Sequence, residues 1–384
     1  MMQAVLPEVQ SPECSEFDVD AAIARLAEFP YQDRPYAARN WGHPLHSLCS
    51  YPSKLKPAVA HWLVRLFTRH GDRVLDPFSG VGTVPFEACS QGRVGLGTDL
   101  SPLAVAVTAA KVRPATNEEA TVALAQLAAE LLEAAAAVDL AAIEPEIRTF
   151  FHDDTCREVL AARQLLVGTD LGATHGGRTL TAAVCHILHG NRPYALSRRS
   201  HGVIPIPPRG DFIYKSLLRS LAEKLDRMSL DELPYSFVPG ASALATAFAQ
   251  DLDEGYVDAI VTSPPFLGTT EFLRQNRVRL WFCGMTYDSQ RVERGQFLEY
   301  RRDLACYRDL FAEWSRILRP GGRLVMHLGV VGGRDMAGEI RPLADSGHFE
   351  VHTVLYEPVR HLESHGRTNR GATHTHQFLI ATRR

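Results

Sequence analysis

Residues 263–266, Ser-Pro-Pro-Phe, follow an apolar run at 257–262 and carry groups suited to holding a flat, amino-bearing base. The run is typical of a buried parallel strand, and the two prolines cannot continue it because each lacks a backbone donor. The tetrapeptide is therefore expected at the carboxyl end of a strand, where open α/β sheets bind ligands. The Ser263 hydroxyl and the Pro264 carbonyl can accept hydrogen bonds from an exocyclic NH2, and Phe266 offers a stacking face. A strand that simply ends in a proline turn is the alternative for this segment alone.

A second segment, residues 73–83, leads from apolar residues through Asp76 into a glycine-rich turn and then a helix. Gly80 and Gly82 let the backbone approach a ligand without an intervening Cβ. Pro85 occupies the place of the third glycine of a dinucleotide fingerprint, and no lysine is present, so GxGxxG and P-loop motifs are both excluded. The next strand, residues 92–98, ends at Asp99, whose carboxylate can accept both hydroxyls of a ribose.

Residues 76–83 (DPFSGVGT), Asp99 and residues 263–266 (SPPF) together resemble the DNA amino-methyltransferases that use S-adenosylmethionine (SAM). SPP followed by an aromatic residue is similar to the N4-cytosine subgroup, whereas N6-adenine enzymes more often carry DPPY. Residues 51–57 (YPSKLKP) look like the family segment that closes over the methionine end of SAM. Residues 318–326 resemble the helix–PGG–strand unit of class I methyltransferases.

The resemblance implies an α/β fold with a class I (Rossmann-like) methyltransferase sheet, and methyl transfer from SAM to the N4 amine of a flipped cytosine in DNA. The implied catalytic residues are Ser263, Pro264, Pro265 and Phe266. The implied SAM contacts are Ser53, Lys54, Asp76, Pro77, Phe78, Gly80, Gly82, Thr83, Asp99 and Ser101. Family members usually carry Gly-Asp-Ala on the third strand, but residues 238–242 contain no acid, so the candidate contacts for the SAM adenine are Ser242, a backbone group or another segment.

Two alternative functions stay open at this point. The same chemistry could act on the N6 amine of adenine in DNA or on a base in RNA, because the walls of the pocket decide which base fits. The other alternative is a non-catalytic nucleic-acid-binding module of the same fold, which only the missing third-strand acid favours.

The chain of 384 residues has an ordinary globular composition, 45% hydrophobic and 22% charged, and is long for a single methyltransferase domain. Ala- and Leu-rich stretches between residues 114 and 234 have helical spacing. We therefore predict a helical insertion between the second and third strands and assign it to target recognition; a structural or dimerising role is the alternative. The predicted organisation is an N-terminal extension at 1–40, a catalytic domain at 41–113 and 235–384, and the insertion at 114–234.

The net charge of −3 is unusual for a DNA enzyme, because phosphate contacts dominate non-specific affinity. Between residues 189 and 224, however, seven basic residues face two acidic ones and are interleaved with aromatic residues. Such a mixture suits phosphate contacts and base stacking, although a solvated helix face has the same composition. The candidate nucleic-acid contacts are Arg192, Arg198, Arg199, Arg209 and Lys215.

The seven cysteines are widely spaced without a CxxC pair, so we expect reduced thiols in a cytoplasmic protein and no metal site. No Pro-Cys dipeptide occurs, which removes the usual nucleophile of cytosine C5 methylation. Neither a signal peptide nor a run able to span a bilayer is apparent. DNA is the expected partner and a cognate restriction endonuclease a further candidate; no membrane partner is expected, and the oligomeric state is left open.

Overall fold

The computed structural model describes most of the chain. The described residues are 17–38, 40–51, 53–190, 194–199, 208–228, 230, 232–266, 271–301, 303–359, 363–364, 367–368 and 373–384.

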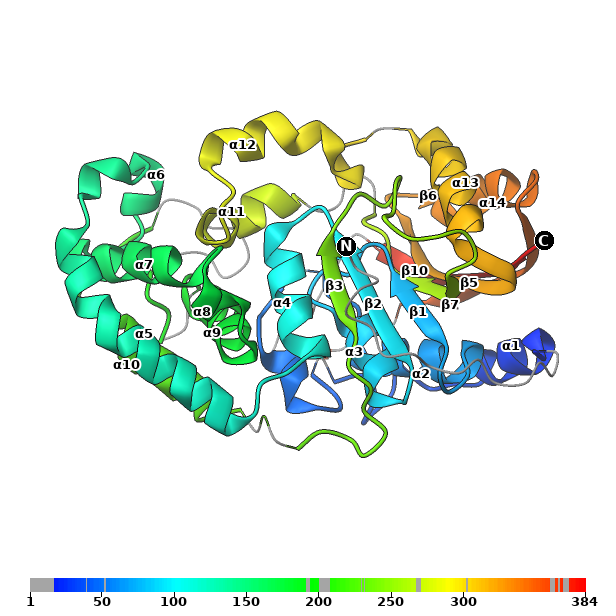
Figure 1. The fold of residues 1–384 in the computed structure, drawn as a ribbon. Coiled ribbons are helices and arrows are strands. Elements are labelled where there is room, and N and C mark those ends of the chain that lie inside the picture. The colour runs from blue at the N-terminus through cyan, green and yellow to red at the C-terminus, as the bar shows by residue number, and fades with distance from the viewer. Residues whose placement is uncertain are drawn as a thin grey trace.

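A central sheet with the strand order β3-β2-β1-β4-β5-β10-β7 organises the fold (Figure 1). Strands β1 to β5 are parallel, and β10 runs antiparallel between β5 and β7. The strand order reverses at β1 and β4, and this switch point creates a crevice at the carboxyl edge. The strands are β1 (Arg73–Asp76), β2 (Val94–Asp99), β3 (Ala241–Leu244), β4 (Val257–Thr262), β5 (Leu318–Val331), β6 (Arg334–Asp335, paired with β5), β7 (Phe349–Pro358) and β10 (Thr373–Arg383), with β8 (Glu363–Ser364) and β9 (Arg367–Thr368) forming a separate pair.

Helices cover both faces of this sheet because neighbouring strand residues point to opposite sides. Val74 of β1 packs in the cluster that contains α1 and α2, whereas Leu75 packs in the cluster that contains α13 and α14. The helices outside the chain between α4 and β3 are α1 (Val19–Ala27), η2 (Pro44–Ser47), α2 (Pro57–Phe67), α3 (Thr83–Ser90), α4 (Pro102–Val112), α11 (Phe272–Phe282), α12 (Tyr287–Val292), η4 (Glu293–Gln296), η5 (Leu298–Tyr300), η6 (Leu304–Cys306), α13 (Tyr307–Ile317) and α14 (Met336–Asp345). The predicted class I sheet is thereby confirmed.

The chain between β2 and β3 forms a helical lobe beside α4, as predicted (Figure 1). Its helices are α5 (Asn117–Ala137), η3 (Leu140–Ala142), α6 (Pro145–Arg148), α7 (Asp153–Leu166), α8 (Asp170–Ala173), α9 (His175–Ile187) and α10 (Leu217–Leu225). Leu103 and Val107 of α4 belong to the same buried cluster as α5, α7 and α9. The lobe is therefore packed onto the catalytic domain through a shared core.

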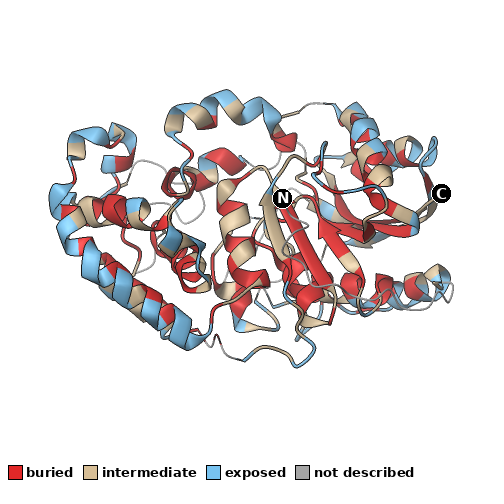
Figure 2. Cartoon of the chain, viewed as in Figure 1, coloured by how far each residue is buried: buried red, intermediate tan, exposed pale blue. Residues whose placement is uncertain are grey.

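Helix α5 differs from expectation, because it is long and apolar enough to cross a membrane by length and composition alone. A capping box of Thr116 and Glu119 starts the helix. One stripe, which includes Leu127 and Leu131, is buried in the lobe, whereas the opposite face is exposed (Figure 2). This pattern is that of an amphipathic surface helix in a folded domain.

Candidate active site

A pocket of about 520 Å³ lies at the carboxyl edge of β1, β2, β4 and β5. In Figure 1, α11 and α12 lie above this edge of the sheet. No described residue of the insertion lines the pocket. The predicted site residues that do line it are Ser53, Lys54, Asp76, Pro77, Phe78, Gly80, Thr83, Asp99, Ser263, Pro264, Pro265 and Phe266.

The glycine loop joins β1 to α3 and packs against Thr108 of α4. Gly82 caps α3 with φ 66°, and a Cβ at this position would lie 2.8 Å from Oγ1 of Thr108. Gly80, with φ 51°, lines the pocket beside Tyr51. Gly82 therefore lies outside the pocket lining, and its role is to let the loop turn tightly against α4.

The buried carboxylate of Asp76 ends β1, and the half-buried carboxylate of Asp99 ends β2. Oδ1 of Asp76 accepts hydrogen bonds from the Thr262 hydroxyl at 2.6 Å and the Phe78 N–H at 3.1 Å, whereas Oδ2 of Asp99 accepts from the Gly80 N–H at 2.9 Å. Burial raises the pKa of Asp76 to about 7 and that of Asp99 to about 6. Each carboxyl thus has defined backbone or hydroxyl donors, with Asp99 placed to accept ribose hydroxyls as well.

Ser101 also lies outside the pocket lining. Its N–H donates to Oδ1 of Asp99 at 2.9 Å, and its hydroxyl accepts from the Ala104 N–H at the start of α4. Ser101 therefore orients the Asp99 carboxylate and caps α4, and in this way it supports the pocket without lining it.

The Ser263–Phe266 edge directly follows β4, as the two prolines predict. Because Thr262 pairs with Met326, Ser263 lies beside His327 of β5, and its Oγ is 3.1 Å from Nδ1 of that histidine. The ring of Phe266 also lies near His327, with centroids 6.0 Å apart. The Ser263 hydroxyl thus lies within hydrogen-bond distance of an imidazole at the pocket wall.

The third strand begins later in the chain than the family comparison of residues 238–242 suggested. Ala241 begins β3, and Ser242 lies within it, where its hydroxyl donates to the Val105 carbonyl at 3.2 Å. Ser242 therefore faces α4 and is not a contact of the pocket. The turn after the strand, Thr246 to Phe248, lines the pocket instead. This turn also has no acid.

Sequence patterns did not single out Glu299, which also lines the pocket. Its side chain is buried, and its Oε1 has no hydrogen-bond partner among the described residues. Burial raises the pKa of Glu299 to about 7, and the charge of Asp99 acts in the same direction. An unpartnered buried acceptor in the same pocket as Asp99 fits a ligand that brings hydroxyl or amino donors.

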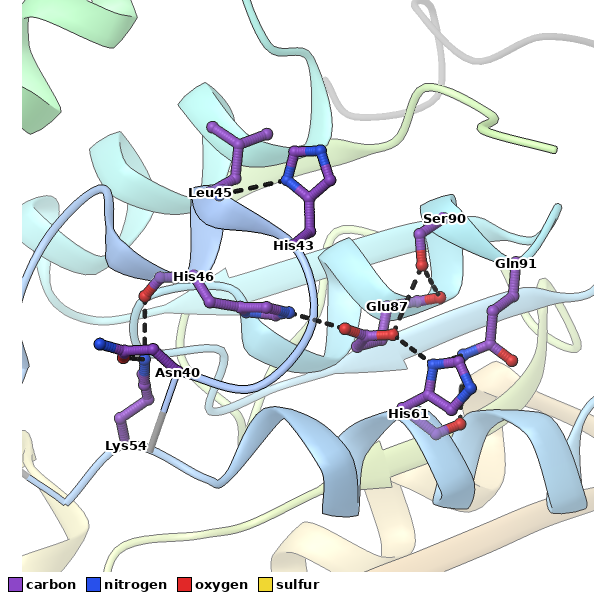
Figure 3. Close-up of polar contacts among 9 residues, drawn as sticks. All are labelled: Asn40, His43, Leu45, His46, Lys54, His61, Glu87, Ser90 and Gln91. Carbon is purple, nitrogen blue, oxygen red and sulfur yellow. Dashed lines mark hydrogen bonds and ion pairs between the residues drawn. The ribbon is translucent and has the colours of Figure 1, made fainter. Parts of the chain in front are cut away.

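A buried carboxylate of α3, Glu87, joins this helix to η2 and to α2 (Figure 3). Glu87 accepts hydrogen bonds from His46 at 2.6 Å and from His61 at 2.8 Å. Lys54 extends from the same segment and donates to the His46 carbonyl at 2.9 Å and to Asn40 at 3.1 Å. The Lys54 side chain is thereby linked to α3 through His46.

The candidate nucleic-acid contacts divide into two kinds. Arg199 and Arg209 are exposed and joined by a backbone bridge. Arg198 lies 3.9 Å from the centroid of the exposed Phe212 ring but donates to the Thr149 and Gly210 carbonyls. Lys215 donates to the Ala195 and Ser197 carbonyls. The donors of Arg198 and Lys215 therefore stabilise the lobe, and Arg192 lies outside the described residues.

Comparison with known proteins points to the same pocket. The UPF0020 family, described as the RMKL-like methyltransferase domain, matches residues 46–142, which include the glycine loop and Asp99. Ser53, Asp76 and Asp99 of the matched segment line the pocket. No curated protein matches the chain.

Solved structures with a similar arrangement are all distant. The rRNA methyltransferase aviRa from Streptomyces viridochromogenes has 10% identity and a TM-score of 0.35, covering 91% of this chain and 94% of that one. TrmN from Thermus thermophilus has 15% identity and a TM-score of 0.30, covering 86% and 49%. A TehB-like SAM-dependent methyltransferase from Corynebacterium glutamicum has 11% identity and a TM-score of 0.32, covering 85% and 87%. At these scores the likeness carries no argument about the substrate.

Proposed function

We propose that this protein transfers a methyl group from SAM to the N4 exocyclic amine of cytosine in DNA. The observation that carries the proposal is that the Ser263–Phe266 edge, the glycine loop and Asp99 line one pocket, with the Ser263 Oγ 3.1 Å from Nδ1 of His327. A non-catalytic module would have no need to keep both halves of such a site together.

The residues of the pocket suit an amine that is a poor nucleophile, because its lone pair is delocalised into the ring. The Ser263 hydroxyl and the Pro264 carbonyl are the acceptors that would hold its two N–H groups and draw the nitrogen towards tetrahedral geometry. When bound, SAM supplies an electrophilic methyl group on a sulfonium. Positioning of the amine supplies most of the acceleration, on the order of several kcal/mol.

A cytosine inside a duplex cannot reach this pocket, so it must leave the base stack. Phe266 offers the ring face on which the flipped base would lie. Arg199 and Arg209 of the insertion are exposed cations that we assign to contacts with the phosphates of DNA. We expect the reaction to take place in the cytoplasm.

Methyl transfer from isotopically labelled SAM tests the proposal on genomic DNA and on total RNA in parallel. We expect label in DNA, and a loss of at least a hundredfold with Ser263→Ala at unchanged SAM affinity. Label only in RNA would move the substrate to an RNA base. SAM binding without transfer to either polymer would contradict nucleic-acid methylation.

A further inference from the structure

Ser263 begins a hydrogen-bonded chain of three side chains that crosses from β4 to β10. Its Oγ lies 3.1 Å from Nδ1 of His327, and Nε2 of His327 lies 3.0 Å from Nδ1 of His376. The pairing of β5 with β10 brings the two imidazoles together, with ring centroids 5.0 Å apart. All three residues line the pocket.

Both histidines are neutral near pH 7. Burial lowers the pKa of His327 well below its ordinary value, and burial lowers that of His376 to about 4. A neutral imidazole has one N–H donor and one acceptor nitrogen. The hydrogen bond between the two rings can therefore have only two polarities: either His327 donates to His376, or His376 donates to His327.

The two polarities differ in what they leave to the substrate. When Nε2 of His327 donates to His376, Nδ1 of His327 carries no proton and accepts a hydrogen bond from the Ser263 hydroxyl. Both lone pairs of the Ser263 oxygen then stay available for an exocyclic amine. In the reverse polarity, the Nδ1–H group of His327 donates to one of these lone pairs. The Ser263 O–H group then no longer donates to His327 and competes with the N–H groups of the amine for space at the serine oxygen.

We propose that His376 fixes the tautomer of His327 and that His327 thereby holds Ser263 as an acceptor for the substrate amine. Both are positioning residues, since they act through Ser263. The inference rests on the proposed function, because only an N–H substrate needs this polarity at the serine.

Two substitutions at residue 376 separate the hydrogen bond from simple packing. The carbonyl of His376→Asn can still accept from Nε2 of His327, whereas His376→Phe keeps a ring but has no acceptor. We expect His376→Phe to lower kcat at least tenfold with the SAM dissociation constant unchanged, and His376→Asn to retain most of the activity. Equal activity of wild type and His376→Phe would overturn the proposal.

Nuclear magnetic resonance of 15N-histidine-labelled wild type reports the tautomer without any substrate, with His327 identified from the signals that His327→Gln removes. We expect His327 to carry its proton on Nε2, and protonation on Nδ1 would refute the proposed polarity. The proposed function and the proposed hydrogen-bond direction fail separately. Full methyl transfer by Ser263→Ala would refute the catalytic assignment of the serine. The tautomer of His327 tests the direction of the hydrogen bond to His376, whichever base is methylated.

Discussion

Glu299 brings the one unpartnered buried carboxyl oxygen that the described part of the chain places in the SAM pocket. We predict that Glu299→Leu weakens SAM binding about tenfold, because a donor of the ligand loses its acceptor. Glu299→Gln keeps an acceptor oxygen and should stay within a few-fold of wild type. Isothermal titration with SAM measures both values, and equal affinities for the leucine variant and wild type would exclude Glu299 as a ligand contact.

The same carboxyl makes a distinct prediction about stability. Its pKa is about 7 in the folded protein against an ordinary value of 4.5, so the folded chain binds more protons between these pH values and stability falls as pH rises through them. From pH 5 to pH 8, Glu299→Gln should gain about 2 kcal/mol relative to wild type. Urea unfolding without SAM at both pH values measures this difference, and parallel curves would contradict the shifted pKa.

Lys111 of α4 is fully buried, and its Nζ has no hydrogen-bond partner among the described residues. Burial lowers its pKa to about 7, and the charge of Lys54 acts in the same direction. Between pH 7 and pH 10 the unfolded chain therefore binds one more proton, and stability rises with pH by up to about 1.4 kcal/mol per pH unit.

Lys111→Met should remove this rise and increase the free energy of unfolding at pH 7, as measured by urea unfolding at pH 7 and pH 9. Lys111→Arg, which cannot lose its charge, is the matched control and should destabilise at both. A methionine variant that is less stable than wild type and equally dependent on pH would show that Lys111 is not a buried, unpaired amine.

At the scale of elements, Glu87 joins α3 to α2 and to His46 of η2, whose carbonyl accepts from Lys54 of the closure segment (Figure 3). Burial alone would raise the pKa of Glu87, but the hydrogen bonds from His46 and His61 lower it to about 2. Glu87→Ala should therefore cost about 3 kcal/mol of stability. It should also weaken SAM binding, because His46, which accepts from Lys54, loses its partner.

Gln91→Ala is the matched control, since Gln91 bonds to His61 at 3.1 Å but does not reach the closure segment. Thermal unfolding and SAM titration of both variants test this coupling. If the two variants bind SAM equally well, the closure segment does not depend on Glu87.

At the scale of the whole molecule, a net charge of −3 leaves DNA affinity to local cations. Arg199→Glu combined with Arg209→Glu should weaken DNA binding and reduce the slope of log affinity against log salt by about 2. Arg25→Glu, on the exposed face of α1, is the matched control. Fluorescence anisotropy at several salt concentrations measures the slopes, and an unchanged slope would place the DNA on another surface.

The sequence was sufficient for the parts of the fold and pocket that depend on local patterns. The glycine loop, Asp99 and the proline edge each end a strand, so their common position follows from a parallel sheet. Helical spacing likewise predicted the insertion.

Long-range pairing decided what the sequence could not predict. The partner of Ser263 depends on the β4–β5 register, and that of His327 on the β5–β10 register. The weak pattern Ala-Ser-Ala-Leu hid the start of β3, which its pairing with β2 reveals. Glu299 lies in a short 3-10 helix whose sequence has no motif.

The most direct test of the central claim is the chemical position of the transferred methyl group. DNA methylated by the wild-type protein is digested to nucleosides, which are separated by chromatography and identified by mass. We predict N4-methylcytosine, which disappears with Ser263→Ala. The isomeric 5-methylcytosine would contradict the account, because attack at carbon requires a covalent nucleophile rather than amine acceptors at the Ser263–Phe266 edge.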